Sequence, residues 1–156
     1  MKIYQGVYDG KDKKFAIVVS RFNSMVTEKL LKGALDCLTR HGVSEDDIEV
    51  FWVPGSLETI FVAKQLVTAG RYDGIIVLGA VIRGETFHFE VVANEVARAM
   101  AQFNVIGKVP VTFGVLTTDT VEQAVNRAGA KLGNKGFEAA LVALEMANLS
   151  EQFELV

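Results

Sequence analysis

The chain has 156 residues, half of them hydrophobic, and a formal net charge of -3. A chain of this length can bury a sizeable core, and we expect one domain spanning residues 1–156. The acidic balance argues against a nucleic-acid surface, and glycine or charged residues interrupt each apolar run before it could span a bilayer. Because the N-terminal stretch also lacks the apolar core of a signal peptide, we expect the surplus of apolar residues at contacts within a homo-oligomer.

The first predicted elements are a strand and a helix. Residues 15–20, FAIVVS, form a continuous apolar run, which is typical of a strand covered on both faces. A helical pattern follows at 24–41, where Asn23 or Ser24 can cap the start and Gly42 can end the helix.

Two further pairs of strand and helix follow in the middle of the chain. Residues 48–53, IEVFWV, and 74–82, GIIVLGAVI, have the composition of strands buried on both faces. Between and after them, residues 57–69 and 88–103 have apolar side chains at helical spacing.

The last third of the chain contains one more strand and two helices. The strand is predicted at 109–116, and the helices are predicted near 120–129 and 136–149. Thr120 with Gln123 fits a capping box at the start of the first of these helices.

Strand and helix alternate, so the predicted fold class is α/β, a three-layer αβα sandwich around a flavodoxin-like or Rossmann-like four-stranded parallel sheet. Residues 1–5 are predicted to add a short edge strand or to pair with a neighbouring chain. Ligands bind beyond the carboxyl ends of parallel strands. The segments at those ends are 20–23, 54–58, 79–88 and 113–119.

The tetrapeptide RGET, residues 83–86, joins the strand at 74–82 to the helix at 88–103. The first turn of a helix has unpaired N–H groups and the positive end of the helix dipole, which favours binding of phosphate or carboxylate. Glycine allows close backbone approach, and Thr86 adds a hydroxyl. The alternative is an ordinary helix cap with Thr86 as the N-cap residue.

His88 lies at the start of the same helix. A neutral imidazole can move protons near pH 7, and a helix N-terminus disfavours its charged form. The alternative is a hydrogen-bonded surface histidine, but the position beside the predicted anion site favours catalysis. The other histidine, His41, is interpreted as a cation at a helix C-terminus. With Cys37 as the only cysteine, no structural zinc site or internal disulfide is predicted, and we expect a reducing, cytoplasmic setting.

Other polar and aromatic residues at the strand ends each allow two interpretations. Phe22 can stack on a planar heterocycle or pack on the helix below it. Glu58 can hold hydroxyl groups through charge-assisted hydrogen bonds or complement a helix dipole. Arg127, Lys131 and Lys135 are candidate anion ligands or members of a solvated basic loop. Neither a Walker loop nor a Gly-x-Gly-x-x-Gly motif is present, so neither ATP nor NAD is supported.

The motifs SRFN, VPGSLE, GAVIRGETFHFE, FGVLTTDTVEQAVNRAG, GNKG and ALEMANL, taken together over residues 1–150, resemble lumazine synthase, the penultimate enzyme of riboflavin biosynthesis. The resemblance implies condensation of 5-amino-6-(D-ribitylamino)uracil with 3,4-dihydroxy-2-butanone 4-phosphate. The products are 6,7-dimethyl-8-ribityllumazine, phosphate and water, and no cofactor takes part. The alternatives are a non-catalytic flavodoxin-like module that binds a flavin or lumazine, and a structural compartment protein with a vestigial pocket.

The resemblance also implies a role for each residue at the strand ends. Toward the phosphorylated substrate, Glu85, Thr86 and Arg127 receive the phosphate, His88 moves protons, and Phe113 closes the pocket from an adjacent subunit. The remaining residues hold the pyrimidine (Phe22, Ala80, Val81, Ile82 and Lys135) or its ribityl chain (Ser56, Leu57 and Glu58).

The sequence departs from the family pattern at three positions. Leu57 stands where Phe or Trp is common, and Ala130 stands where threonine is frequent. Glu85 puts a carboxylate beside the expected phosphate; because like charges repel, we expect its side chain to point away while its backbone N–H binds. These changes are expected to affect substrate affinity more than the type of reaction.

Members of the family assemble as pentamers, and often as sixty-subunit icosahedral shells, with the site between neighbouring subunits of a pentamer. The segment GAKLGNKG, residues 129–136, has no insertion, which is typical of shell-forming members. The resemblance therefore implies a homo-oligomer and favours the shell, with riboflavin synthase as a candidate cargo.

Overall fold

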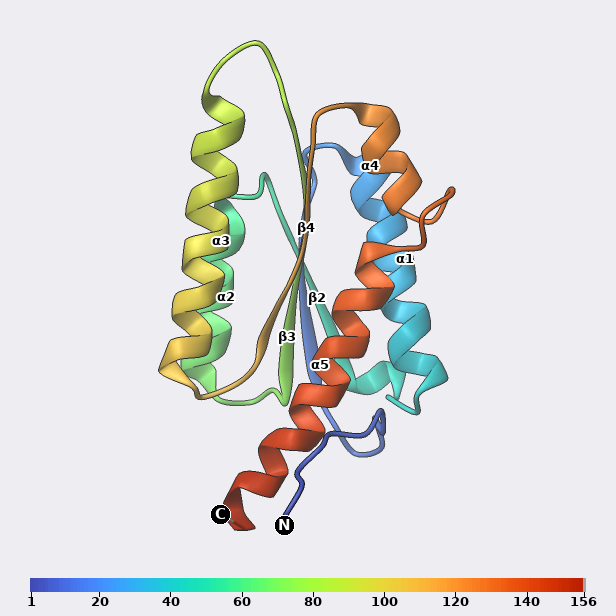
Figure 1. Cartoon of the computed structure of the whole chain (residues 1–156), viewed down its shortest axis with the longest axis vertical. Coiled ribbons are helices and arrows are strands. Elements are labelled where there is room, and N and C mark those ends of the chain that lie inside the picture. Colours follow the sequence, from blue (N-terminus) through green and yellow to red (C-terminus); the bar gives the residue numbers. More distant parts are fainter. Residues whose placement is uncertain (156) are drawn as a thin grey trace.

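A computed structural model describes residues 1–155 and contains one sheet of four parallel strands (Figure 1). Val156, with which the predicted domain ends, lies outside the described residues. The strand order is β2-β1-β3-β4, and all three neighbouring pairs are parallel. The strands are β1 (Phe15–Ser20), β2 (Ile48–Val53), β3 (Gly74–Ile82) and β4 (Val111–Thr118).

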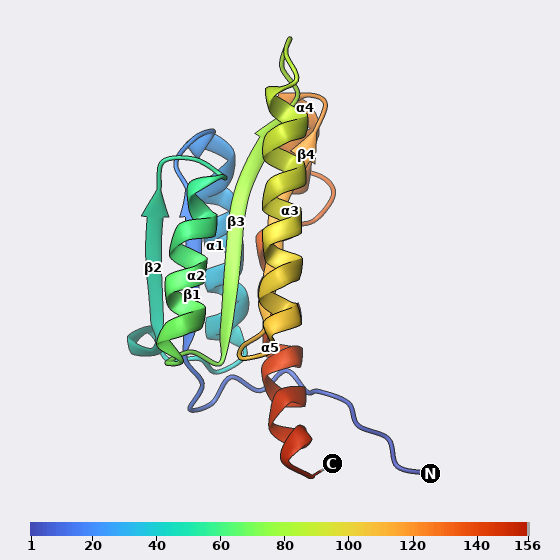
Figure 2. The ribbon, with the colours of Figure 1, turned by 90° about the vertical axis from the view of Figure 1, so that its left-hand side faces the viewer.

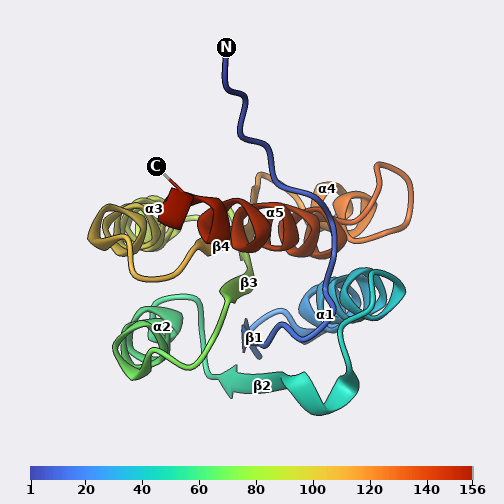
Figure 3. The same ribbon diagram turned by 90° about the horizontal axis from the view of Figure 1, so that it is seen from below.

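Helices cover both faces of this sheet, so the predicted three-layer α/β sandwich is confirmed. In the described part of the chain α2 and α3 lie on one face, and α1, α4 and α5 lie on the other (Figures 1 and 3). The helices are α1 (Ser24–Arg40), α2 (Glu58–Ala69), α3 (His88–Ile106), α4 (Val121–Arg127) and α5 (Lys135–Glu151). Short 3-10 turns occupy Glu45–Asp47 and Gln152–Leu155. Among residues 1–155, no helix has the length and apolarity needed to cross a membrane.

The sheet divides the core in two, as the inner strand β1 shows. Phe15, Ile17 and Val19 pack with α1 and α5, whereas Ala16 and Val18 pack with α2 and α3. All five residues are fully buried, because successive side chains of a strand point to opposite faces and a helical layer covers each face here. Each large aliphatic side chain buried in this way stabilises the fold by about 1.5–3 kcal/mol.

Three strands have the predicted bounds, but β4 begins and ends two residues later than expected. Pro110 has no backbone N–H; it takes part only as an acceptor, receiving a hydrogen bond from the N–H of Ile75. At the other end, Thr117 and Thr118 continue the ladder beside β3, although they are polar. The apolar run alone therefore misplaced this strand.

The prediction that 48–53 is covered on both faces is wrong. Val50 and Trp52 are 37% and 39% exposed, because β2 lies at the outer edge of the sheet and pairs only with β1 (Figure 2). Apolar composition indicates a strand, but it does not show whether a second strand lies beside it. This edge is left open in a single chain.

The predicted edge strand at residues 1–5 does not form within the chain. This segment is irregular and leads away from the sheet (Figure 3). Side-chain amides of α5 and of the turn after it hold the N-terminal segment, since Asn148 donates to Asp9 O at 2.9 Å and Gln152 donates to Gln5 O at 2.8 Å. Pairing with a neighbouring chain stays a prediction.

Candidate active site

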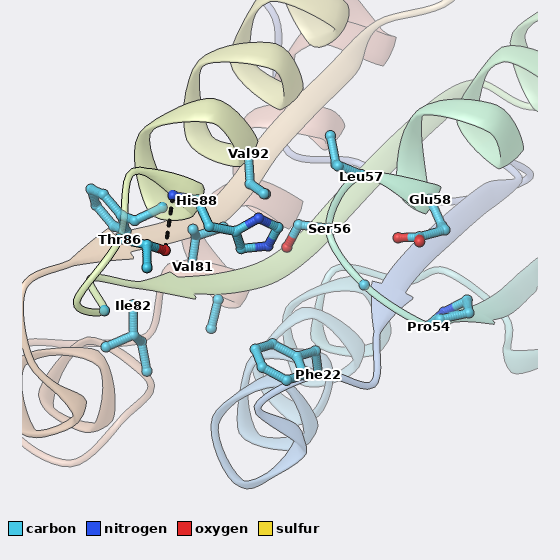
Figure 4. Close-up of a pocket in the computed structure, with 14 residues that line it drawn as sticks. Phe22, Pro54, Ser56, Leu57, Glu58, Val81, Ile82, Thr86, His88 and Val92 are labelled. Carbon is cyan, nitrogen blue, oxygen red and sulfur yellow. Dashed lines mark hydrogen bonds between the residues drawn. The ribbon is translucent and has the colours of Figure 1, made fainter.

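A hollow of about 480 Å³ lies beyond the carboxyl ends of β1, β2 and β3, where the parallel sheet predicts a ligand site (Figure 4). Most of the predicted site residues line it together, namely Phe22, Ser56, Leu57, Glu58, Ala80, Val81, Ile82, Thr86 and His88. The ring of His88 is directed into the hollow, with Phe22 on the opposite side (Figure 4). Segments far apart in sequence therefore meet at one edge of the sheet.

Backbone contacts between the strand ends place Phe22 at the rim. Its N–H donates to Pro54 O at 3.0 Å, which continues the pairing of β1 with β2 past the end of the strands. Asn23 has a left-handed backbone (φ 63), and its side chain donates to Ala80 O at 2.8 Å instead of capping α1. Of the two predicted cap residues, Asn23 and Ser24, Asn23 occupies the N-cap position of α1, but its side chain connects to β3 instead of bonding to the helix. Phe22 is left 71% exposed, free of the core.

Gly79 of β3 makes room for two hydroxyl groups beside the hollow. A Cβ at this position would lie 2.7 Å from Ser56 Oγ and 3.1 Å from Ser20 Oγ. Ser56 lines the hollow, whereas Ser20 is fully buried and its hydroxyl has no hydrogen-bond partner within residues 1–155. Any side chain larger than glycine would displace these hydroxyls.

The turn before α3 leaves backbone donors free. Within the described chain, no acceptor meets the N–H groups of residues 84–87. Phe87, not Thr86, occupies the N-cap position, and no side chain caps the helix there. Thr86 Oγ1 accepts only a long 3.4 Å hydrogen bond from the N–H of His88. The alternative that Thr86 is an ordinary N-cap residue is therefore wrong. The free amides of residues 84–87 suit an anion.

The hollow holds few charges. Glu58 and His88 are its only ionisable residues, and no Lys or Arg is among the described residues that line it. Glu85 is exposed and does not line the hollow; that its carboxylate points away from a bound phosphate stays a prediction. An anion bound at residues 84–87 would thus meet backbone donors and a hydroxyl, but no full positive charge from this part of the chain.

Three predicted site residues lie elsewhere. Phe113, Arg127 and Lys135 line a separate hollow of about 400 Å³ beside β4, α4 and the start of α5. Arg127 and Thr86 line different hollows of one chain, so the expectation that both hold one phosphate stays a prediction for a site between neighbouring subunits. The reason for the separation is topological, because β4 is an edge strand and α4 lies on the sheet face opposite α3. Lys131, the other candidate anion ligand, lines neither hollow.

Sequence reasoning missed two apolar residues of the first hollow, Phe89 and Val92. Val92 lies one helical turn after His88, on the same face of α3. That spacing could have revealed Val92 once His88 was chosen as a site residue. Phe89 is held by another contact, since the Arg83 guanidinium carbon lies 4.7 Å from the centre of its ring.

The fold and the site define the class of protein first: a flavodoxin-like α/β enzyme whose hollow suits a planar ring and a small anion. A sequence model of the family described as 6,7-dimethyl-8-ribityllumazine synthase matches residues 12–151. A protein of this name from Thermotoga maritima is 63% identical over 152 residues, covering 97% of this chain and 92% of that one. A protein of the same name from Thermotoga neapolitana is 64% identical over 152 residues, covering 97% of this chain and 92% of that one. Another from Kosmotoga olearia is 57% identical over 156 residues, covering 100% of both chains.

The chain belongs to the 6,7-dimethyl-8-ribityllumazine synthase family. The motifs quoted from the sequence had implied this family, and the expectation is confirmed. Membership makes the chain a transferase of riboflavin biosynthesis, and it does not favour the two alternatives, a non-catalytic binding module and a structural shell protein.

Proposed function

We propose that the chain condenses 5-amino-6-(D-ribitylamino)uracil with 3,4-dihydroxy-2-butanone 4-phosphate to give 6,7-dimethyl-8-ribityllumazine, phosphate and water, and that the first hollow is one half of the active site. The observation that carries this proposal is the joint placement of Phe22, His88 and the free amides of residues 84–87 around one hollow. These groups serve a planar ring, a proton transfer and an anion, which are the needs of this reaction.

The pyrimidine side of the site is formed by Phe22 and the β2–α2 turn. The exposed ring of Phe22 offers a stacking surface for a flat heterocycle. Ser56 and Glu58 present a hydroxyl and a carboxylate to the ribityl chain, whose hydroxyls can donate charge-assisted hydrogen bonds to Glu58. Leu57 covers the same wall with an aliphatic rather than an aromatic side chain.

The phosphate side of the site needs a cation that the first hollow does not contain. The amides of residues 84–87 and the hydroxyl of Thr86 supply neutral donors at the positive end of α3. We assign the missing charge to Arg127 of a second copy, whose hollow beside β4 also contains Phe113 and Lys135. Two incomplete hollows, one with donors and one with cations, then make one complete site.

The chemistry requires several proton transfers. The substrate amine attacks the ketone and forms an imine with loss of water. Phosphate is then eliminated together with the proton on the neighbouring carbon, and the resulting enol tautomerises to a new ketone. The second amine attacks this new carbonyl and closes the ring with loss of a second water. His88 can relay the protons, an effect worth roughly 10²–10⁴-fold. Holding the two substrates in attack geometry can contribute more, up to about 7–11 kcal/mol of the barrier.

The proposed assembly is a pentamer, and we favour a sixty-subunit shell with riboflavin synthase as candidate cargo. Exposed apolar side chains on the edge strand β2 and on α5 support contacts between copies, among them Trp52 and Val142. The uninterrupted loop at 129–136 favours the shell. We place the protein in the cytoplasm, where its only thiol, Cys37, is kept from reacting because burial raises the pKa of the group to about 11.

Co-expression of two strongly impaired variants tests the shared site, with lumazine fluorescence as the readout. His88→Ala removes one half-site and Arg127→Ala removes the other. In mixed assemblies with equal amounts of both, about a quarter of the sites receive two native halves, so activity returns toward that fraction of wild type. As a control, His88→Ala mixed with Phe22→Ala restores nothing, since both changes lie in the same half. No recovery in the first mixture would show that the site is not shared, and no fluorescence from the wild-type protein would refute the reaction itself.

A further inference from the structure

Arg83, the first residue after β3, is held from three sides. Its Nε donates to Asp119 Oδ1 at 2.8 Å, and its Nη1 donates to Glu90 Oε1 at 3.4 Å. The guanidinium also lies 4.7 Å from the centre of the Phe89 ring. Its backbone N–H donates to Thr118 O at 2.8 Å, which extends the pairing of β3 with β4 by one residue.

These contacts pair the charge of Arg83 with two carboxylates outside the hollow. Two carboxylates compensate its positive charge, and the hydrogen bond to Asp119 above all raises the pKa of the guanidinium. Arg83 also does not line the hollow, although it directly precedes the turn that does. A cation next to a phosphate turn would be the obvious ligand, but the geometry gives this one a different task.

The side chain of Arg83 joins two elements that flank the turn at residues 84–87. Phe89 and Glu90 belong to the first turn of α3, next to His88, whereas Asp119 directly follows β4. The turn between them has one long hydrogen bond and no helix cap. Within residues 1–155, Arg83 is therefore the main restraint on where the free amides and the imidazole lie.

Asp119 extends the same connection to the second hollow. Its N–H donates to Gln123 Oε1 at 2.9 Å, and the N–H of Gln123 donates to Thr120 Oγ1 at 3.1 Å. These bonds fix the start of α4, the helix that ends at Arg127. We infer that Arg83 and Asp119 are positioning residues. They hold the turn at residues 84–87 and His88 on one side and the N-terminus of α4 on the other.

This inference rests on the proposed function, and the energetics favour a role in positioning over one in stability. Arg83 and Asp119 are 49% and 65% exposed at their side chains, and exposed ion pairs contribute little to folding. A shift of about 1 Å at a reacting group, by contrast, can lower a rate by roughly 10²-fold.

The test is steady-state kinetics of Arg83→Gln, Asp119→Asn and the double variant, with both substrates varied. We expect kcat to fall by about tenfold to a hundredfold and KM for the butanone phosphate to rise. KM for the pyrimidine should stay unchanged, because Phe22 and Ser56 do not contact Arg83 or Asp119. The double variant should be no worse than the more impaired single variant, since both remove one interaction. Arg83→Lys, which keeps a donor toward Asp119, should recover part of kcat.

Arg40→Gln is the matched control, because it breaks an equally short exposed ion pair, 2.7 Å to Asp36, in α1. It should leave both kinetic constants unchanged and shift Tm as little as Arg83→Gln does. Wild-type kinetics in Arg83→Gln, or a rise of both KM values together with a larger loss of Tm, would overturn the inference. Calorimetry with inorganic phosphate separates this inference from the proposed function. Weaker phosphate binding by Arg83→Gln supports the positioning role of Arg83 even if turnover is absent, and unchanged binding contradicts that role.

Discussion

At the scale of single residues, the two histidines have opposite surroundings. His88 enters the hollow at the start of α3, whereas Nδ1 of His41 lies 2.7 Å from Cys37 O at the end of α1. We expect His88→Ala to lower kcat by about 10²–10⁴-fold without abolishing turnover, because substrate positioning remains. Lumazine formation under saturating substrates measures this loss, and His41→Ala should keep wild-type kcat. Full turnover by His88→Ala would rule out the proton-transfer role.

At the scale of elements, the carboxylate of Glu49 connects β1, β2 and β3 at the end of the sheet opposite the first hollow. Glu49 of β2 accepts from Lys14 at 2.8 Å and from Tyr72 at 2.7 Å, residues that directly precede β1 and lie just before β3. The hydrogen bond from Lys14, followed by the one from Tyr72, lowers the pKa of Glu49 below its ordinary value near 4.5.

A lowered carboxyl pKa in the folded state means that the ionised group stabilises the fold above its ordinary pKa. That stabilisation is lost as the pH falls through the lower folded value. Glu49→Gln should therefore lower Tm slightly at neutral pH, and the difference from wild type should shrink below about pH 4.5. Thermal unfolding at several pH values checks this expectation. A difference in Tm that stays constant down to acid pH would show that packing, not charge, explains the effect.

At the scale of the whole molecule, the open edge of β2 exposes the only tryptophan, Trp52. The N-terminal segment leaves the body of the chain with Ile3 and Tyr4 exposed. If residues 1–5 pair with a neighbour's β2, Trp52 is partly shielded from water in the assembly. Deleting these residues should then shift its fluorescence to longer wavelength and lower the mass found by light scattering. An unchanged emission maximum and mass would disprove this pairing.

Much of the fold could be predicted because its signals are local. Continuous Val- and Ile-rich runs gave the bounds of β1, β2 and β3, and the alternation with helical patterns gave the parallel three-layer order. The strand ends then indicated where a site would lie. Residues of the segments 20–23, 54–58 and 79–88 line the first hollow, whereas those of 113–119 line the second. The displacement of β4 and the exposure of β2 escaped prediction, since polar strand residues and edge positions leave no trace in apolar periodicity.

The sequence by itself therefore determined the family, the layered fold and the chemistry available at the strand ends. Only the tertiary structure decided which of these groups share a hollow. It places Arg127 and Thr86 in different hollows, directs the side chain of the N-cap residue Asn23 to Ala80 O, and pairs the guanidinium of Arg83 with two carboxylates. The physical reason is that contacts across a sheet depend on strand order and on the face each helix covers, and no window along the chain contains both partners of such a contact.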